Sequence, residues 1–319
     1  MLSKKSNVLA TDEADLSIVI PNYNHGNTVA NAVRAAAAQR PRPREILVID
    51  DGSTDNSRDV LEALAQQEPR LRVIYLAQNG GVVGANNTGL QEARSRFVNF
   101  GAADDVMRPG LVAAAIPLLE RAPDIAFASG EAMVVDIETG SQSMRPPVLP
   151  SYTSALFDPD HVMGLFRRAD NWILPGTAIF RRDMLLQAGG FDPALASFAD
   201  GYVVRHLAFA HGCAFFRHCG VEWRVVSSGL SRSVAQNPVQ SEALLEAVLE
   251  RMKADPVFPA AYLDLFAQRW RFACARLRVS DQGSVLKVLS LVFLTIKYRP
   301  VSMMGLFKTI VHRKLRPMV

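Results

Sequence analysis

The sequence has few cysteines, no strong excess of charge of either sign and no long uninterrupted apolar run. Its three cysteines, Cys213, Cys219 and Cys274, lack the spacing of a zinc site and are too few for a disulfide framework. The 35 basic and 31 acidic residues leave a net charge of +4, a surplus too small to predict a nucleic-acid partner. These absences favour an ordinary globular protein of the reducing cytoplasm.

Apolar stretches that could meet a membrane are short. The N-terminal segment lacks the apolar core of a signal peptide, which again argues for the cytoplasm. The most apolar stretch, SVLKVLSLVFLTIKYRP (284–300), falls short of the ~20 residues that a spanning helix needs. Because basic residues surround it, two interpretations stay open: peripheral contact with the inner face of the plasma membrane, or a packed helix with a solvated basic edge.

Strand-like and helix-like patterns alternate up to about residue 105. The runs LSIVIPNY, EILVIDD, LRVIYLAQN and RFVNFGAADD are rich in Val, Ile and Leu, as buried strands are. Between them lie segments with helical spacing, such as Val60, Leu61 and Leu64. This alternation predicts an α/β protein with a parallel sheet. The later strand-like runs are less regular, so we expect the sheet to become mixed.

The C-terminal part has a different, helical pattern. In SEALLEAVLERMKAD the residues Leu245, Val248 and Met252 share one helical face, behind Ser241 as a candidate N-cap. We therefore predict two regions, an α/β domain over 1–231 and a helical C-terminal extension over 232–319.

Polar clusters follow the first strands of the predicted sheet: PNYN, DDGSTD, NGG and ADD. Ligands of open parallel sheets bind at the carboxyl ends of the strands, so these loops should form one crevice. Two acid pairs lie there. Asp50 and Asp51 could accept hydrogen bonds from a ligand, and Asp104 and Asp105 are hard oxygen ligands that suit Mn²⁺ or Mg²⁺.

Five motifs together resemble family 2 glycosyltransferases of the GT-A fold: IVIPNYNHGNTVANAV, EILVIDDGSTDNS, NGGVVGANNTGL, FVNFGAADDVMRPG and GTAIFRRDMLLQAGGFDPAL. The resemblance covers roughly residues 15–231. It implies a mixed, mostly parallel sheet flanked by helices. It also implies transfer of a sugar from a nucleotide-sugar donor, most often a UDP-sugar, to a glycan or lipid-linked acceptor, with inversion at the anomeric carbon, in bacterial surface polysaccharide synthesis.

The same resemblance implies nucleotide-binding residues, which all lie in the predicted crevice: Pro21, Asn22, Tyr23, Asp50, Asp51, Asn79, Asn87 and Asp104. Among them Asp51 would hold the base. Asp104 and Asp105 occupy the D-x-D region of the family, where acids bind the ribose and the metal that neutralises the diphosphate.

Two further assignments come from the resemblance. Asp200 lies downstream of GGFD, where the family has the second acid of its ED motif, and is therefore the expected catalytic base. Asn171 and Trp172 precede a segment that resembles the acceptor side; for Trp172, core packing and acceptor contact remain equal alternatives.

The chain departs from the family pattern at Ala102, Asn86, Ala199 and Val226, where acidic, basic or metal-binding residues are usual. Two interpretations follow. The chain is either a non-processive, metal-assisted enzyme with a reduced set of metal ligands, or a catalytically silent nucleotide-sugar-binding module. The acids retained at the expected positions favour the enzyme.

Overall fold

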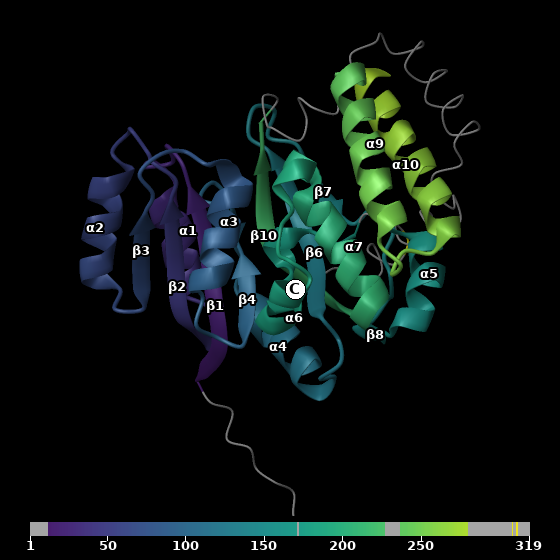
Figure 1. Ribbon diagram of the computed structural model, residues 1–319. Helices are drawn as coiled ribbons and strands as arrows, with labels where there is room; N and C mark the ends of the chain where they lie inside the picture. The colour runs from purple at the N-terminus through teal and green to yellow at the C-terminus, as the bar shows by residue number, and fades with distance from the viewer. Residues whose placement is uncertain (1–11, 171, 227–236, 280–307, 309–310, 312–319) are drawn as a thin grey trace, which may run out of the picture.

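The computed structural model describes residues 12–170, 172–226, 237–279, 308 and 311. Within these residues the strands form one 10-stranded sheet with the order β3-β2-β1-β4-β9-β6-β10-β5, while β7 pairs with β6 and β8 with β10 (Figure 1). The strands are β1 (Glu13–Asn22), β2 (Arg42–Asp50), β3 (Leu71–Tyr75), β4 (Phe97–Phe100), β5 (Val106–Met107), β6 (Phe127–Asp136), β7 (Gln142–Arg145), β8 (Ala155–Phe157), β9 (Ile179–Arg181) and β10 (Cys213–Val225). The helices are α1 (Val29–Ala37), α2 (Ser57–Gln67), α3 (Gly81–Glu92), α4 (Leu111–Arg121), α5 (Pro159–Arg168), α6 (Arg182–Gln187), α7 (Ala199–His211), α9 (Pro238–Ala254) and α10 (Ala260–Val279), with the short 3-10 helices η1 (Pro175–Thr177) and η2 (Pro193–Phe198).

The N-terminal half of the sheet is parallel. β1 pairs in parallel with both β2 and β4, and β2 pairs in parallel with β3. Beyond β4 the sheet is mixed, because β9 runs antiparallel to its neighbours β4 and β6, whereas β6 and β10 run parallel to each other. The predicted α/β class, a mixed and mostly parallel sheet flanked by helices, is confirmed.

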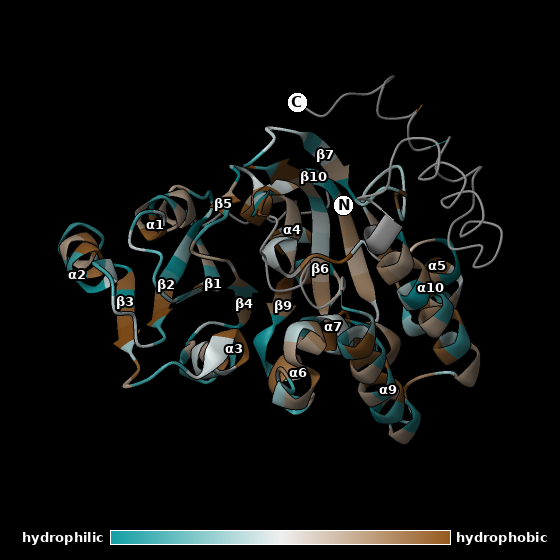
Figure 2. Cartoon of the chain, turned by 90° about the horizontal axis from the view of Figure 1, so that it is seen from above, coloured by the Kyte–Doolittle hydropathy of each residue, from teal (hydrophilic) through white to brown (hydrophobic). Residues whose placement is uncertain are grey.

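Helices cover both faces of the sheet (Figure 2). Successive side chains of β1 point to opposite faces, as a strand requires. Ile18 and Ile20 belong to the apolar cluster that includes residues of α1, α2 and α4. Val19 belongs to the cluster on the other face, with residues of α3, α7, α9 and α10. Both faces of β1 are therefore buried, which explains its nearly continuous apolar sequence.

Consecutive arginines at the junction of β9 and α6 cap two helices on opposite faces of the sheet. The guanidinium of Arg181 is buried and donates to the carbonyl oxygen of Leu119 in α4, at 2.5 Å. The guanidinium of Arg182 donates to the carbonyl oxygen of Leu90 in α3, at 3.0 Å. A cation at the C-terminus of a helix offsets the partial negative charge of its unpaired carbonyls. These two residues thus attach α4 and α3 to the centre of the sheet.

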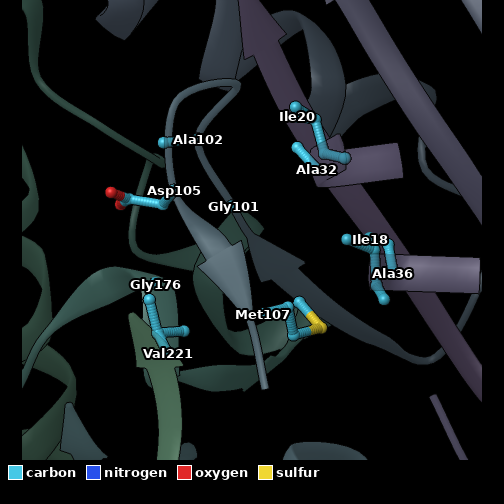
Figure 3. Close-up of a pocket in the computed structure, with 10 residues that line it drawn as sticks. All are labelled: Ile18, Ile20, Ala32, Ala36, Gly101, Ala102, Asp105, Met107, Gly176 and Val221. Atoms are coloured by element: carbon cyan, nitrogen blue, oxygen red, sulfur yellow. The ribbon is translucent and has the colours of Figure 1, made fainter. Parts of the chain in front are cut away.

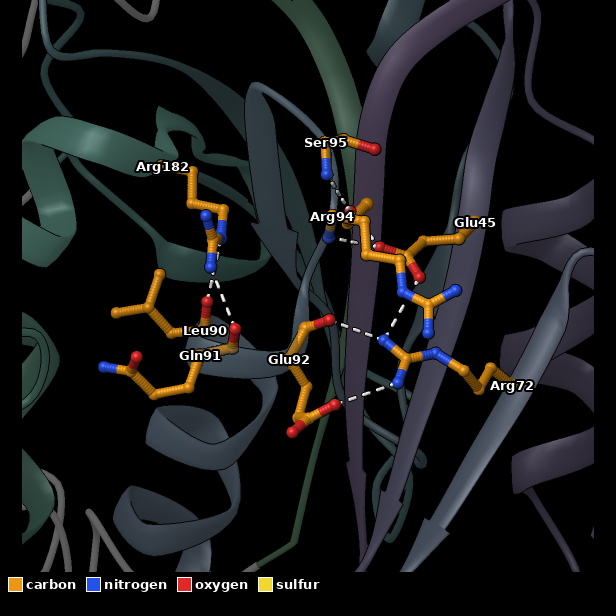
Figure 4. Close-up of polar contacts among 9 residues, drawn as sticks. Glu45, Arg72, Leu90, Gln91, Glu92, Arg94, Ser95 and Arg182 are labelled. Atoms are coloured by element: carbon orange, nitrogen blue, oxygen red, sulfur yellow. Dashed lines mark hydrogen bonds and ion pairs between the residues drawn. The ribbon is translucent and has the colours of Figure 1, made fainter.

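A polar network centred on Glu45 joins the first strands (Figure 4). One carboxylate oxygen of Glu45 accepts hydrogen bonds from the hydroxyl of Ser17 and from the backbone N–H of Arg94, both at 2.6 Å. The guanidinium of Arg72 lies 3.4 Å from the other oxygen. These contacts bind β1, β2, β3 and the segment before β4 together, so they help to align the four parallel strands.

The C-terminal helices α9 and α10 pack against the rest of the protein. Leu245 and Tyr262 are fully buried and belong to the same apolar cluster as Val203 of α7. The predicted helical C-terminal region is therefore present. The predicted boundary at residue 231 and the apolar stretch 284–300 lie outside the described residues.

The predicted N-cap of α9 was wrong. The helix begins earlier, because the side chain of Asn237 accepts hydrogen bonds from the backbone N–H groups of Val239 and Gln240, both at 3.1 Å, and Pro238 occupies the first turn. Ser241 is a buried residue inside the helix. None of the helices in the described part of the chain is both long and apolar enough to cross a bilayer.

Candidate active site

The first acid after β2 joins the ends of β1 and β2. Asp50 is buried, and one of its carboxylate oxygens accepts a hydrogen bond from the side-chain amide of Asn22 at 2.8 Å. The other oxygen accepts the backbone N–H of Ser53 at 3.1 Å. Both predicted residues thus lie at the carboxyl edge of the sheet, where they fix the loop that follows β2.

The second acid, Asp51, joins β2 to α3. Its two carboxylate oxygens accept the backbone N–H groups of Gly80 and Gly81, each at 2.8 Å. These amides belong to the N-terminus of α3, whose unpaired donors and positive partial charge favour an anion. Asp51 is only 3% exposed, so its first role in this structure is to hold the loop after β3 against the loop after β2.

Three other predicted nucleotide-binding residues lie around these acids. Pro21 is half-buried at the end of β1, and Tyr23, directly after β1, is 41% exposed. Asn79 is exposed and its side-chain oxygen accepts the backbone N–H of Gly81 at 2.8 Å. Tyr23 is the aromatic residue of the three, and an exposed aromatic ring can stack on a nucleobase.

Asn87, also among the predicted nucleotide-binding residues, contacts the loop before η2. Its side-chain amide donates to the carbonyl oxygen of Phe191 at 2.7 Å, and its side-chain oxygen accepts the backbone N–H of the same residue at 2.9 Å. Both polar groups of the side chain are therefore engaged with the loop before η2. The structure gives Asn87 the role of joining α3 to this loop, which spacing along the sequence could not reveal.

The acids Asp104 and Asp105 follow β4 and lie beside β1. The chain leaving β4 stays next to this strand, since the backbone N–H of Gly101 donates to the carbonyl oxygen of Val19 at 2.8 Å. Both acids are half-buried. Asp105 lines a small pocket between β1, α1, β5 and β10, and its carboxylate points away from Ile20 and Ala32, which line the opposite side of that pocket (Figure 3).

The charge of Asp105 is only partly compensated. Burial raises the pKa of its carboxyl group to about 7, and the neighbouring Asp104 adds to the rise. The backbone N–H and the positive charge of Arg224 act in the opposite direction. A divalent cation between these carboxylates would supply the missing positive charge, so the residues present fit a cation of the Mn²⁺ or Mg²⁺ type. The described residues contain no group of three His, Cys, Asp or Glu side chains that could hold a metal alone.

Residues of β10 complete this part of the site. The backbone N–H of Arg224 donates to a carboxylate oxygen of Asp105 at 2.8 Å, and the side chain of Arg224 pairs with Glu222 at 2.9 Å. β10 reaches the acids because it pairs with β5, which directly follows them. Sequence reasoning missed Glu222 and Arg224. Their spacing of two on a strand places them on one face, but nothing local indicates that this face meets Asp105.

Asp200 lies in the first turn of α7. It is half-buried, and one carboxylate oxygen accepts the backbone N–H of Gly201 at 2.5 Å. Burial raises the pKa of Asp200, and the charge of Arg205 opposes the rise. A carboxylate with a raised pKa is a better proton acceptor. The contacts described for Asp200 do not include Asp104 or Asp105, so the structure does not bring these acids into direct contact.

Trp172 is fully buried, and its indole packs edge-on against the ring of Phe215, with the ring centres 5.7 Å apart. In this structure the side chain belongs to the core and offers no surface to an acceptor sugar. Of the two alternatives for Trp172, core packing is the one observed. Asn171 lies outside the described residues.

The fold and the site define a class. The parallel strands end in loops that carry Asp50, Asp51, Asp104 and Asp105, at the edge of the sheet where open α/β sheets bind their ligands. A sequence model of glycosyl transferase family 2 matches residues 17–185. The chain belongs to glycosyltransferase family 2, has the GT-A fold and is a glycosyltransferase.

Individual relatives agree with this assignment. The succinoglycan biosynthesis protein ExoO of Rhizobium meliloti (strain 1021) is 29% identical over 266 residues, which cover 80% of this chain and 71% of ExoO. The structure of TarS 1-349 from S. aureus in complex with UDP superposes with a TM-score of 0.61 at 16% identity, covering 95% and 92% of the two chains.

A second solved structure, the mannosyltransferase PcManGT from Pyrobaculum calidifontis in complex with GDP-Man and Mn²⁺, superposes with a TM-score of 0.55 at 18% identity. It covers 94% of this chain and 87% of PcManGT. At these identities the two structures establish the fold alone.

Proposed function

We propose that this glycosyltransferase uses a nucleoside diphosphate sugar, with a UDP-sugar as the first candidate, and transfers the sugar to a glycan or lipid-linked acceptor during bacterial polysaccharide synthesis. The observation that carries the proposal is Asp105, a half-buried carboxylate next to Asp104 in the loop after β4, on one side of the crevice that we propose as the donor site. A partly buried carboxylate beside a second acid is costly unless a cation offsets its charge.

The donor site would use residues on both sides of this crevice. Tyr23 would stack on the base, while Pro21, Asn22 and Asp50 would shape the pocket that receives it. Asp51 and Asn79 would act mainly through the N-terminus of α3, which they hold in place. The structure of TarS has been solved with UDP and that of PcManGT with GDP-Man. These complexes support a nucleotide donor but do not indicate which base it carries.

Asp104 and Asp105 would hold Mn²⁺ or Mg²⁺, with phosphate oxygens and water as the remaining ligands. When bound, the cation neutralises charge on the departing diphosphate and makes it a better leaving group. The complex of PcManGT with GDP-Man and Mn²⁺ supports a metal-assisted reaction on this fold.

Asp200 would act as the base of a non-processive, inverting transfer. Its carboxylate takes the proton of an acceptor hydroxyl, the hydroxyl oxygen attacks the anomeric carbon, and the bond from that carbon to the diphosphate breaks on the opposite face. The raised pKa of Asp200 supports this role, because a more basic carboxylate accepts the proton more readily.

The proposed acceptor class is supported by a relative, and the proposed location at the membrane is supported by the charge of one stretch of the sequence. ExoO is a succinoglycan biosynthesis protein, which supports polysaccharide as the product class. A cytoplasmic enzyme meets both nucleotide sugars and lipid-linked acceptors at the inner face of the plasma membrane. The basic, apolar stretch 284–300 would provide a peripheral contact with that face.

Calorimetric titration with UDP, dTDP, GDP and CDP, each with and without Mn²⁺, tests the donor site. We expect one nucleotide to bind, with an affinity that Mn²⁺ increases, and the increase to disappear in Asp104→Asn with Asp105→Asn. Asp124→Asn is the matched control, since this exposed acid precedes β6 at the opposite edge of the sheet. If no nucleotide binds at millimolar concentration, the donor site is wrong.

A turnover assay distinguishes an active glycosyltransferase from a catalytically silent binding module. Release of nucleoside diphosphate from the matching sugar donors, in the presence of bacterial lipid extract, should be lost in Asp200→Asn while nucleotide affinity is kept. Nucleotide binding without release in the wild-type protein would instead favour a catalytically silent binding module.

A further inference from the structure

The C-terminal helices contact the helix that carries Asp200. Tyr202 and His206 of α7 both reach Asp255, which follows α9: the Tyr202 hydroxyl donates to its carboxylate at 2.9 Å, and the imidazole Nδ1 of His206 lies 2.7 Å from the same oxygen. Figure 1 shows α9 and α10 beside α7. The region predicted as a separate extension is thus packed against a helix of the candidate active site.

Arg205 is the centre of a second and deeper contact. It is 8% exposed, and its guanidinium makes hydrogen bonds in three directions. Nε donates to the hydroxyl of Tyr262 in α10 at 2.8 Å, Nη1 to the carbonyl oxygen of Gly201 at 2.8 Å, and Nη2 to the carbonyl oxygen of Asp170 at 2.9 Å. A guanidinium holds such partners rigidly because its donors lie in one plane. Arg205 therefore ties the first turn of α7 to α10 and to the segment before η1.

Aromatic packing fixes the same turn from its other side. Phe198 lies so close to Gly201 that a Cβ at this position would be 2.4 Å from the Phe198 ring. The ring of Phe198 packs against Phe266 and Trp270 of α10, with ring centres 5.4 Å and 4.9 Å apart. The guanidinium carbon of Arg205 lies 5.2 Å from the centre of the Phe198 ring. Residues on both sides of Asp200 are thus held by α10.

We infer that Arg205, held by the hydroxyl of Tyr262, is a positioning residue that sets the first turn of α7 and so directs the carboxylate of Asp200. The inference rests on the proposed role of Asp200 as the base. It assigns a function to the C-terminal helices that is independent of any membrane: they complete the active site by bracing the helix that carries its base.

The charges around this contact determine its effect on proton transfer. Arg205 is the charged group that acts on Asp200, and its charge lowers the pKa of that acid. Arg205 in turn faces Asp170 and Tyr262, and Arg269 of α10 lies 3.2 Å from Asp170. If Arg205 moves away, Asp200 loses its compensating charge and its pKa rises. A base with a higher pKa is deprotonated only at higher pH.

Two tyrosine variants of the full chain provide a matched test. Tyr262→Phe removes the hydroxyl that holds Arg205, and Tyr202→Phe removes a hydroxyl from the same helix interface without touching Arg205. Arg205→Lys is the third variant, and Asp200→Asn is measured alongside. Transfer is followed as nucleoside diphosphate released from UDP- and GDP-sugars with bacterial lipid extract, over a range of pH, and UDP and GDP affinities are measured by calorimetry.

We expect Tyr262→Phe and Arg205→Lys to lower kcat by roughly 10-fold or more, because a misplacement of ~1 Å can reduce a rate ~100-fold. The acidic limb of kcat should move to higher pH, and nucleotide affinity should stay that of the wild type. Tyr202→Phe should keep the wild-type kcat and pH profile. This pattern would support the inference.

If Asp200→Asn is inactive and Tyr262→Phe behaves like Tyr202→Phe, the positioning role is overturned while the proposed function stands. If Asp200→Asn is as active as the wild type, the assignment of the base fails, and the positioning role falls with it.

Discussion

The carboxylate of Asp51 at the end of β2 accepts the backbone N–H of Gly81 at the N-terminus of α3, at 2.8 Å. Its other oxygen accepts the N–H of Gly80. An acid that the family resemblance assigns to base binding is therefore also a hydrogen-bond acceptor for two backbone amides at the start of α3. Asp51 builds the crevice in addition to any contact that it makes with a ligand.

Replacing Asp51 should therefore reduce stability as well as nucleotide affinity. Asp51→Asn puts an amide group, which cannot accept a hydrogen bond, in the place of one of the two oxygens. We expect the free energy of unfolding to fall by about 0.5–1.5 kcal/mol, the usual net contribution of one hydrogen bond, because Gly80 and Gly81 are exposed and water can reach their amides. Urea denaturation measures this change, with Asp124→Asn as the exposed control. Equal stability of the two variants would contradict this role of Asp51.

Two glycines of α3 should respond oppositely to alanine. A Cβ at Gly89 would lie 2.2 Å from Cγ1 of Val19 in β1, whereas a Cβ at Gly84 would meet no atom within 4 Å. Overpacking should lower the free energy of unfolding of Gly89→Ala by about 1–3 kcal/mol. Gly84→Ala should raise it by about 0.5–1 kcal/mol, since glycine is unfavourable inside a helix. Denaturant unfolding of both variants tests whether α3 approaches β1 closely. Equal changes in the free energy of unfolding would disprove this close approach.

The neighbouring arginines at the junction of β9 and α6 should differ in how well lysine can replace them. Arg181 is buried and donates to carbonyls at and just beyond the end of α4, so Arg181→Lys should cost at least about 1.5–3 kcal/mol, the usual contribution of one charge-assisted hydrogen bond. Arg182→Lys should cost less, because its contact with Gln91 is exposed and water can replace it. Thermal unfolding compares the two. A larger loss for Arg182→Lys would contradict the assigned capping roles.

The contact between α7 and the C-terminal helices should weaken in acid. Burial would raise the pKa of Asp255, but hydrogen bonds from Val257, His206 and Tyr202 outweigh it, and the pKa lies below its ordinary value of 3.8. An acid with a lowered folded-state pKa stabilises the fold above its unfolded-state pKa, and this stabilisation is lost as the pH falls through the folded-state value.

Asp255→Asn should accordingly be less stable than the wild type near neutral pH, and the difference should shrink as the pH falls below about 4. Urea denaturation at several pH values measures this difference in the free energy of unfolding. Asp264→Asn, at an exposed position on α10, should keep the pH dependence of the wild type. A difference that does not change with pH would show that Asp255 does not stabilise this interface as a carboxylate.

The helices and strands of the parallel half could be predicted because their signals are local. Apolar runs such as Ile46–Ile49 end in polar, turn-forming residues, and the acids follow directly. The start of α9 was predicted incorrectly, since Asn237 and Ser241 are both good N-caps and only the packing of Leu245 and its neighbours selects between them. The sequence also could not decide whether Trp172 is buried, because this residue is a single aromatic in a loop-like segment.

The sequence by itself determined the α/β class, the family and the position of each acid pair at the end of a strand, because apolar periodicity and turn residues act over a few neighbouring positions. Only the tertiary structure decided what each side chain contacts. Asp105 meets Arg224 across 119 positions, and Arg205 meets Tyr262 across 57. Such contacts depend on how distant elements pack against one another, and a single sequence does not specify the geometry of that packing.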